Sequence, residues 1–218
     1  MEQIRRAYRR ESEETRREAL ISATQSLVAE GGPEAATVRA IAARAGVTPG
    51  LIRHYFSSKD DLTRAAYIAL IDGMTEKGAE ALREADDRPE ARLAAFIVAS
   101  LTPPVVDISA VVLWAGYMHK IRADSELRGV HQGGYLRYRN TLQSLIADLP
   151  REVSAARLRR DAIASNAMID GLWLEGSILP DGFADGEIVA TGLLAIGTIV
   201  GCDLLSHMKL AKPESAAE

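Results

Sequence analysis

Polar side chains that can contact DNA are concentrated in the segment GVTPGLIRHYFSSKDDL, residues 46–62. Between Arg53 and Lys59 it carries a guanidinium, an imidazole, a phenol and an ammonium group. Such groups bind base edges and phosphate oxygens, but they also occur on any solvated helix surface. The segment is therefore either an ordinary amphipathic helix or a helix that reads DNA, and its neighbouring elements have to decide between the two.

Two further helices are expected before this segment. Ser12 can cap the first one, whose apolar residues recur at three- and four-residue spacing until the Gly-Gly-Pro sequence at 31–33 ends it. Thr37 caps a short second helix, and Gly46 makes the turn after it. Thr48, followed by proline at the first helical position, begins a third helix. Two short helices joined by a tight turn behind a bracing helix predict a helix-turn-helix head.

The third helix should lie in the major groove of DNA. Ile52 and Phe56 are apolar and four residues apart, so they are expected to face the core with Ile41 and Leu62. The accessible positions are then Thr48, Pro49, Gly50, Arg53 and Tyr55. Small residues at the start of the helix allow its backbone to approach the DNA closely.

The rest of the chain also predicts helices. A long one is expected from Asp60 to about Ala85, and others near 89–101, 107–122, 125–148, 153–179 and 185–208. The predicted fold is all-α: a helix-turn-helix domain over residues 1–60, with a flexible arm at 1–11, and a helical ligand-binding and dimerisation bundle over 61–218. No hydrophobic stretch is long enough to span a bilayer.

Composition favours a soluble protein with local rather than general affinity for polyanions. The net charge of the 218 residues is −4, with 47% hydrophobic and 26% charged residues. Cys202 is the single cysteine, so a reducing cytoplasm is the expected location. The sequence contains neither metal-binding spacings nor hydrolase, P-loop or dinucleotide motifs, so no enzyme activity, metal or cofactor is expected.

The segment TVRAIAARAGVTPGLIRHYFSSKDDL, residues 37–62, resembles the DNA-binding domain of the TetR family of bacterial repressors. The resemblance covers about residues 12–65 and implies an all-helical body, a homodimer and a double-stranded DNA operator. The sequences DGLWLEGS, YLRYRNTLQSL and LIRHYF are similar to the BetI-type branch, which includes choline-responsive repressors. That similarity implies a small cationic or amphipathic effector, for example a cationic amine such as choline.

The expected DNA-binding residues are Thr37, Thr48, Pro49, Gly50, Arg53, His54, Tyr55 and Lys59. Arg53 departs from the tyrosine that many family members carry, and arginine can bind guanine O6 and N7 in a bidentate manner. The resemblance implies phosphate contacts for Tyr55 and Lys59. Alternatives stay open: the two threonines can act only as helix caps, His54 can pack in the core, and the basic arm at 1–11 can be solvated or follow the DNA.

The expected effector-binding residues are Trp114, Tyr117, Tyr138, Asp170 and Trp173. Aromatic faces and a carboxylate can hold a quaternary ammonium by cation–π and charge attraction, although aromatic residues at helical spacing are also common in cores. Glycines recur in the last two helices at 171, 176, 192, 197 and 201. Close approach of helix backbones in a dimer is the expected reason, because glycine otherwise weakens a helix.

The sequence thus predicts a homodimeric repressor that a small molecule releases from a pseudo-palindromic operator. A second hypothesis is a DNA-bound scaffold whose body recruits a protein partner without an inducer. A closed pocket near Trp114 and Tyr117 would favour the first, and a filled body with an exposed apolar patch the second.

Overall fold

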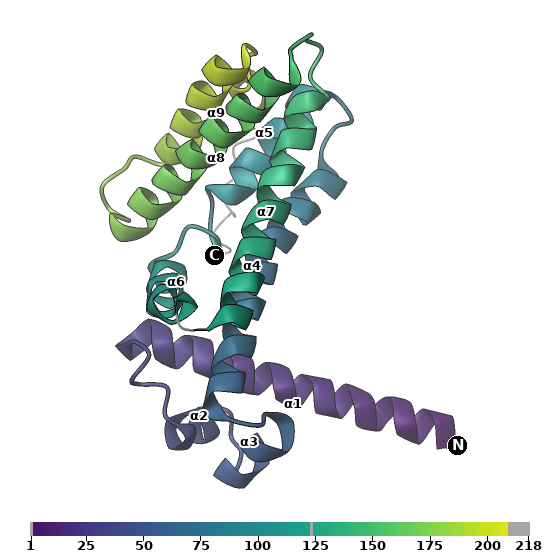
Figure 1. The fold of residues 1–218 in the computed structure, drawn as a ribbon, viewed down its shortest axis with the longest axis vertical. Helices are drawn as coiled ribbons and strands as arrows, with labels where there is room; N and C mark the ends of the chain where they lie inside the picture. Colours follow the sequence, from purple (N-terminus) through teal and green to yellow (C-terminus); the bar gives the residue numbers. More distant parts are fainter. Residues whose placement is uncertain (1, 123, 209–218) are drawn as a thin grey trace, which may run out of the picture. The chain divides into compact units, whose positions relative to one another are not determined.

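Helices joined by short loops make up the described part of the computed structural model, which covers residues 2–122 and 124–208, with backbone only at 2–12, 119 and 120 (Figure 1). Within this part no strand occurs, so the all-α prediction is confirmed. The elements are α1 (Glu2–Gly31), α2 (Val38–Arg44), α3 (Pro49–Tyr55), α4 (Lys59–Glu84), α5 (Pro89–Ser100), α6 (Ile108–Ile121), α7 (Ser125–Ala147), α8 (Ala155–Ile178), α9 (Glu187–Val200) and a 3-10 turn at Leu205–His207. In the same part, no helix is long and apolar enough to cross a membrane.

The helices form two compact units. The head unit comprises residues 1–73 and 108–132, and the body unit comprises residues 74–107 and 133–218. Helices α4 and α7 each contribute to both units. The sequence-based division into residues 1–60 and 61–218 stays a prediction; the head unit extends past residue 60 into α4 and includes α6.

Helix α1 begins earlier than expected. It starts at Glu2, so Ser12 lies inside the helix and does not cap it. The sequence before Ser12 contains neither proline nor glycine, and nothing in it ends a helix. The arm at 1–11 was also predicted to contact DNA. Residue 1 and the side chains of this arm lie outside the described part of the structure, so this contact stays a prediction.

The head unit packs α1 against α2, α3, α4 and α6 around one apolar core. Its fully buried members include Leu20, Ile41, Leu62 and Tyr67. The cap residue Thr37 accepts a hydrogen bond from the Ala40 N–H (3.1 Å), which fixes the start of α2. This core therefore holds the two short helices in a defined position within the unit.

The body unit has a separate core, made by α5, α7, α8 and α9. Leu93, Ile97, Leu142, Leu193 and Ile196 are fully buried in it. Helices α8 and α9 lie side by side over their length (Figure 1).

The end of α9 differs from the expectation of a helix to residue 208. Gly201 has a left-handed backbone (φ 77°) and its N–H bonds to the Gly197 carbonyl, which ends α9 at Val200. The segment that follows, residues 202–205, folds back along the helix, and we call it the strap. A Cβ on Gly197 would lie 2.6 Å from the Cys202 carbonyl oxygen in this strap. An αL glycine cap stops a helix regardless of the apolar residues around it.

Contacts within one chain explain most of the glycines that recur in and just after the last two helices. A Cβ on Gly192 would clash with Leu101, and one on Gly176 would lie 3.2 Å from Val106. Together with the roles of Gly197 and Gly201, these contacts give four of the five glycines a role within one chain that requires no dimer. Gly171 differs: it is exposed, and no atom lies within 4 Å of a Cβ added there. The dimer explanation stays a prediction for Gly171.

Candidate functional site

The turn between α2 and α3 is built on backbone geometry that the sequence predicted. Gly46 has φ 65°, a conformation that L side chains rarely adopt, and the Val47 N–H bonds to the Ala42 carbonyl at 2.9 Å. Thr48 has the extended backbone of an N-cap, but its side chain makes no capping hydrogen bond. Its hydroxyl therefore stays available to a ligand, whereas the Thr37 oxygen already accepts the Ala40 N–H.

Helix α3 is anchored by its predicted apolar residues. Ile52 is 3% and Phe56 2% exposed, and both pack into the head core with Ile41 and Leu62. Phe56 also ends the helix, because its N–H bonds to the Ile52 carbonyl at 2.9 Å. The opposite face of α3 is thereby turned to solvent.

The remaining predicted DNA-binding residues lie on that solvent face or at its edges. Thr48, Pro49, Gly50, Arg53 and His54 are exposed, and Tyr55 and Lys59 are half-buried. His54 contacts the Tyr55 ring edge-on, with 5.0 Å between ring centroids, and does not enter the core. Contact of these residues with DNA stays a prediction, and such contact requires side chains that are at least partly accessible, as all of these are.

Two arginines of α2 take different roles. Arg44 forms a bidentate pair with Glu30, both N–O distances being 2.7 Å, and this pair joins the ends of α1 and α2. The hydrogen bonds from Arg44 lower the pKa of Glu30. Arg39, in the first turn of α2, is exposed. Arg39 was not among the predicted DNA-binding residues, although it lies two residues after the Thr37 cap and so places a positive charge near the start of α2.

Two of the predicted effector-binding residues belong to the head unit. Trp114 is half-buried, and Tyr117 is only 2% exposed and packs on Tyr67 with 4.8 Å between ring centroids. The Tyr117 hydroxyl is buried and has no hydrogen-bond partner among the described atoms. The Tyr67 hydroxyl shares a 2.7 Å hydrogen bond with Nδ1 of His131. Burial raises the pKa of Tyr117 and lowers the pKa of His131, because burial disfavours the charged form of each group.

The other three lie in the body unit. The Tyr138 hydroxyl donates to Ser100 Oγ at 2.7 Å, and its ring lies 4.9 Å from that of Phe96. The Trp173 indole N–H donates to the Val105 carbonyl at 2.8 Å. These bonds give both aromatic residues a packing role in the unit core. One effector site that combines the head pair and the body trio stays a prediction.

Asp170 is set in a hydrogen-bonded cluster. Its Oδ2 accepts from the Tyr135 hydroxyl and from Nδ2 of Asn166, both at 2.7 Å. Burial raises the pKa of Asp170. None of the described basic residues forms an ion pair with this carboxylate. The Asn166 Oδ1 is buried and unpartnered among the described atoms. A partly desolvated carboxylate without a counter-ion is a candidate cation site. Tyr135 and Asn166 were not predicted: Tyr135 contacts Asp170 from another helix, α7, whereas Asn166 lies four residues before Asp170 on α8 itself.

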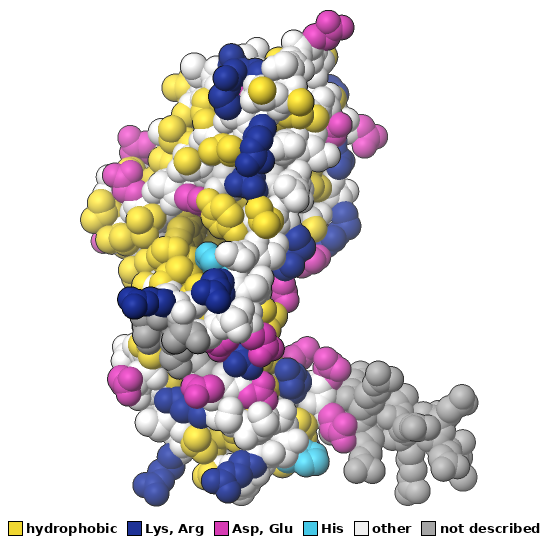
Figure 2. Space-filling view, viewed as in Figure 1, with side chains coloured by type: hydrophobic (Ala, Val, Ile, Leu, Met, Phe, Trp, Pro, Cys, Tyr) yellow, Lys and Arg dark blue, Asp and Glu magenta, His cyan; other side chains and the backbone are white. Residues whose placement is uncertain are grey.

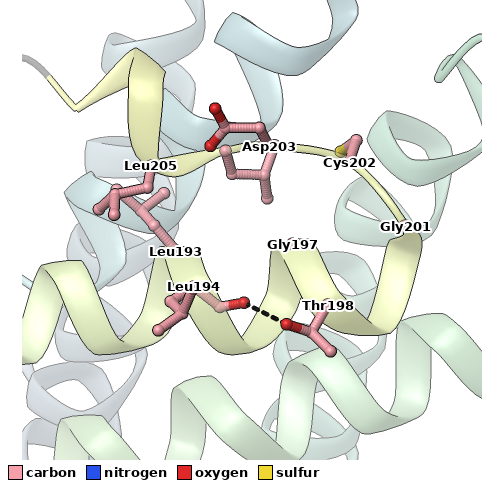
Figure 3. A pocket seen from close by; sticks show the side chains of 9 residues that line it. Leu193, Leu194, Gly197, Thr198, Gly201, Cys202, Asp203 and Leu205 are labelled. Carbon is pink, nitrogen blue, oxygen red and sulfur yellow. Dashed lines mark hydrogen bonds between the residues drawn. The ribbon is translucent and has the colours of Figure 1, made fainter.

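A groove of about 430 Å³ runs along α9 on the side of the strap (Figure 3). It is lined by Leu193, Leu194, Gly197, Thr198, Gly201, Cys202, Asp203, Leu204 and Leu205. Its lining is mostly apolar, and burial raises the pKa of the Cys202 thiol, so this cysteine is poorly reactive. Among the described residues no group of histidine, cysteine and acidic side chains is arranged to hold a metal ion.

Comparison with known proteins covers both parts of the chain. Residues 20–66 match the family described as "Bacterial regulatory proteins, tetR family", and residues 89–200 match "BetI-type transcriptional repressor, C-terminal". The HTH-type transcriptional regulator BetI 2 of Chromohalobacter salexigens is 34% identical over 199 residues, which are 87% of this chain and 92% of that protein. BetI of Burkholderia thailandensis is 29% identical over 76% of this chain and 83% of its own.

Solved structures of other transcriptional regulators have the same fold as this chain. A protein assigned as a transcriptional regulator from Pseudomonas aeruginosa PAO1 superposes with a TM-score of 0.75 at 27% identity, over 89% of this chain and 95% of its own. Another, from Saccharomonospora viridis and in complex with choline, has the same fold, with a TM-score of 0.68 at 18% identity over 85% and 95% of the two chains. With its helix-turn-helix head and its BetI-type body, this chain belongs to the TetR family and is a DNA-binding transcriptional regulator rather than an enzyme.

Proposed function

We propose that the protein is a homodimeric repressor that binds a pseudo-palindromic operator in the cytoplasm and is released by a small molecule. The observation that supports this most directly is the exposed face of α3. Ile52 and Phe56 fix the helix from behind, and Arg53 stands free at the surface of a helix-turn-helix. In this arrangement the helix enters the major groove, and its exposed side chains reach base edges and phosphates.

Arg53 and Lys59 should differ in what they contribute. Arg53→Ala is expected to weaken binding to a preferred duplex by about 1–3 kcal/mol per half-site while binding to a scrambled duplex changes little. Lys59→Ala is expected to weaken both equally and to reduce the slope of log K against log salt by about 1 per subunit. Fluorescence anisotropy measures both, using a duplex that the wild-type protein selects from a random library.

Arg83→Ala provides the control, because it removes one exposed positive charge in α4 outside the helix-turn-helix. If Arg53→Ala weakened binding to the selected and scrambled duplexes equally, Arg53 would not be a base reader.

The proposed dimer uses the outer faces of α8 and α9. Large apolar side chains there are exposed in the single chain, and hydrophobic atoms gather over these helices in Figure 2. They are Ile163, Leu174 and Ile178 on α8, Leu179 just after it, and Leu194 on α9, which is 61% exposed. Gly171 lies on the same face of α8 and leaves room for a second backbone. An exposed apolar patch of this kind favours burial against a second copy.

The proposed effector is a small organic cation such as choline. Its support is the Asp170 carboxylate, which is partly buried, holds hydrogen bonds from Tyr135 and Asn166, and has no basic partner among the described residues. The choline bound to the Saccharomonospora viridis relative of the same fold agrees with this class of ligand. Release from DNA would follow if the cation binds more tightly to a conformation whose heads do not fit the operator.

A thermal-shift titration with choline chloride tests the effector. At 100 times its Kd, a ligand specific for the folded state stabilises by about 2.7 kcal/mol, so the melting temperature should rise by several degrees. Asp170→Asn should weaken choline binding at least tenfold, because a buried charge loses its partner. Asp148→Asn removes an exposed carboxylate of the body unit and should leave choline binding unchanged.

Sodium chloride at equal ionic strength separates ligand binding from a salt effect. A melting temperature that rises equally with choline chloride and sodium chloride would contradict the cationic effector, although the DNA-binding part of the proposal would stand.

A further inference from the structure

Arg17 is fixed against the end of the DNA-reading helix. Its guanidinium carbon lies 4.6 Å from the centroid of the Phe56 ring, although Arg17 belongs to α1. Phe56 is 2% exposed and ends α3. The cation therefore covers the outward face of an anchored ring, and the position of the arginine is set by the same residue that fixes the helix.

The hydrogen-bond donors of Arg17 are not used within the described part of the chain. The residue is exposed, and it forms neither an ion pair nor a hydrogen bond with any described side chain. The carboxylate of Asp61, five residues after Phe56, is engaged elsewhere: it accepts from the N–H and hydroxyl groups of Ser57, at 3.0 and 3.1 Å. A guanidinium stacked on a ring keeps its in-plane N–H groups free, and little flexibility remains to be lost when they bind.

The residues next to Phe56 in the sequence indicate what Arg17 would bind. Phe56 follows Tyr55 directly and precedes Lys59 by three residues, and both of these are proposed phosphate contacts. We infer that Arg17 is a third phosphate-binding residue of the operator complex, held by Phe56 at the C-terminal end of α3. Arg17 thereby adds a contact from α1 to the contacts proposed for Tyr55 and Lys59. The inference rests on the DNA-binding activity of the family and does not depend on the effector or on repression.

Arg17 and Arg16 form a matched pair for a test. They are adjacent and exposed in α1, and each alanine substitution removes one positive charge, but the structure places only Arg17 over the Phe56 ring. Binding of a selected duplex and of a random-sequence duplex would be measured by anisotropy from 50 to 300 mM KCl. Arg17→Ala should weaken both on the order of tenfold and reduce the salt slope by about 1 per subunit. Arg16→Ala should leave the slope within error of the wild type.

Two further variants separate a phosphate contact from a structural role. Arg17→Lys keeps the charge but lacks the planar group, so it should recover part of the affinity. In a Phe56→Leu background, Arg17→Ala should cost less than in the wild type, because the ring no longer positions the arginine. An unchanged slope for Arg17→Ala, or equal effects of the Arg16 and Arg17 substitutions, would overturn the inference while leaving the proposed operator binding intact. Failure of the wild-type protein to bind DNA would instead contradict the proposed function itself.

Discussion

Replacing Asp161 with asparagine is expected to lower the free energy of unfolding by about 3 kcal/mol. Asp161 is 3% exposed, and its carboxylate pairs with Arg151 at 2.8 Å and with Arg157 at 2.6 Å. The same arginines donate to the last carbonyls of α9, from Arg151 to Val200 (3.0 Å) and from Arg157 to Ile199 (3.2 Å). Without the carboxylate, Arg151 would keep a poorly compensated charge, and the end of α9 would lose its support.

Urea denaturation followed by circular dichroism measures this loss. Glu80→Gln is the control, because the Lys77–Glu80 pair (2.6 Å) belongs to the same unit but both side chains are more than 40% exposed. An exposed pair contributes about 0–1 kcal/mol. If the two substitutions destabilised the protein equally, the buried network would not be what holds the end of α9.

Replacing Leu194 with aspartate is expected to convert the dimer into monomers and to weaken operator binding by about 10² to 10⁴-fold. Leu194 is 61% exposed in the single chain, so a charge there costs little within the subunit, but it would be buried and unpaired at an α8–α9 interface. Two tethered heads bind two half-sites with a gain that a monomer lacks. Gly171→Leu should act in the same direction by filling the space left for a second backbone.

Sedimentation velocity and anisotropy would be measured on the same samples. Leu136→Asp serves as the control: Leu136 is 45% exposed and belongs to α7, which is not one of the two proposed interface helices. A dimer that survives Leu194→Asp with undiminished affinity would contradict the proposed interface. A wild-type monomer would favour the alternative in which this apolar face recruits a different protein.

The head was predictable because its determinants are local. The Gly46 turn, the Thr48-Pro49 start and the four-residue spacing of Ile52 and Phe56 each act within one helical turn. The structure agrees on the three short-range features: the left-handed glycine, the extended cap residue and the buried pair. One local detail was wrong, because Thr48 caps with its backbone geometry and not with its side chain.

Contacts between distant segments were not predictable in the same way. The role of Asp161 was not predicted. It depends on Arg151, which donates both to the Asp161 carboxylate and to the Val200 carbonyl, and that arrangement depends on how α8 and α9 pack. The glycines were recognised as unusual, yet their reason came from Leu101, Val106 and the strap after α9. Arg17 is one of several arginines in the sequence of α1, and only the fold shows that it lies over the Phe56 ring. A sequence pattern indicates which face of a helix is apolar, but it does not identify the partner of that face.

The central claim is that the exposed face of α3 reads a specific DNA sequence as part of a symmetric dimer. Selection of a random duplex library by the wild-type protein tests it most directly. The expected result is enrichment of a pseudo-palindrome with half-sites about 34–36 Å apart, bound at least about 10³-fold more tightly than a scrambled duplex at 150 mM KCl. Recovery of unrelated sequences, bound no better than the scrambled duplex, would contradict the claim.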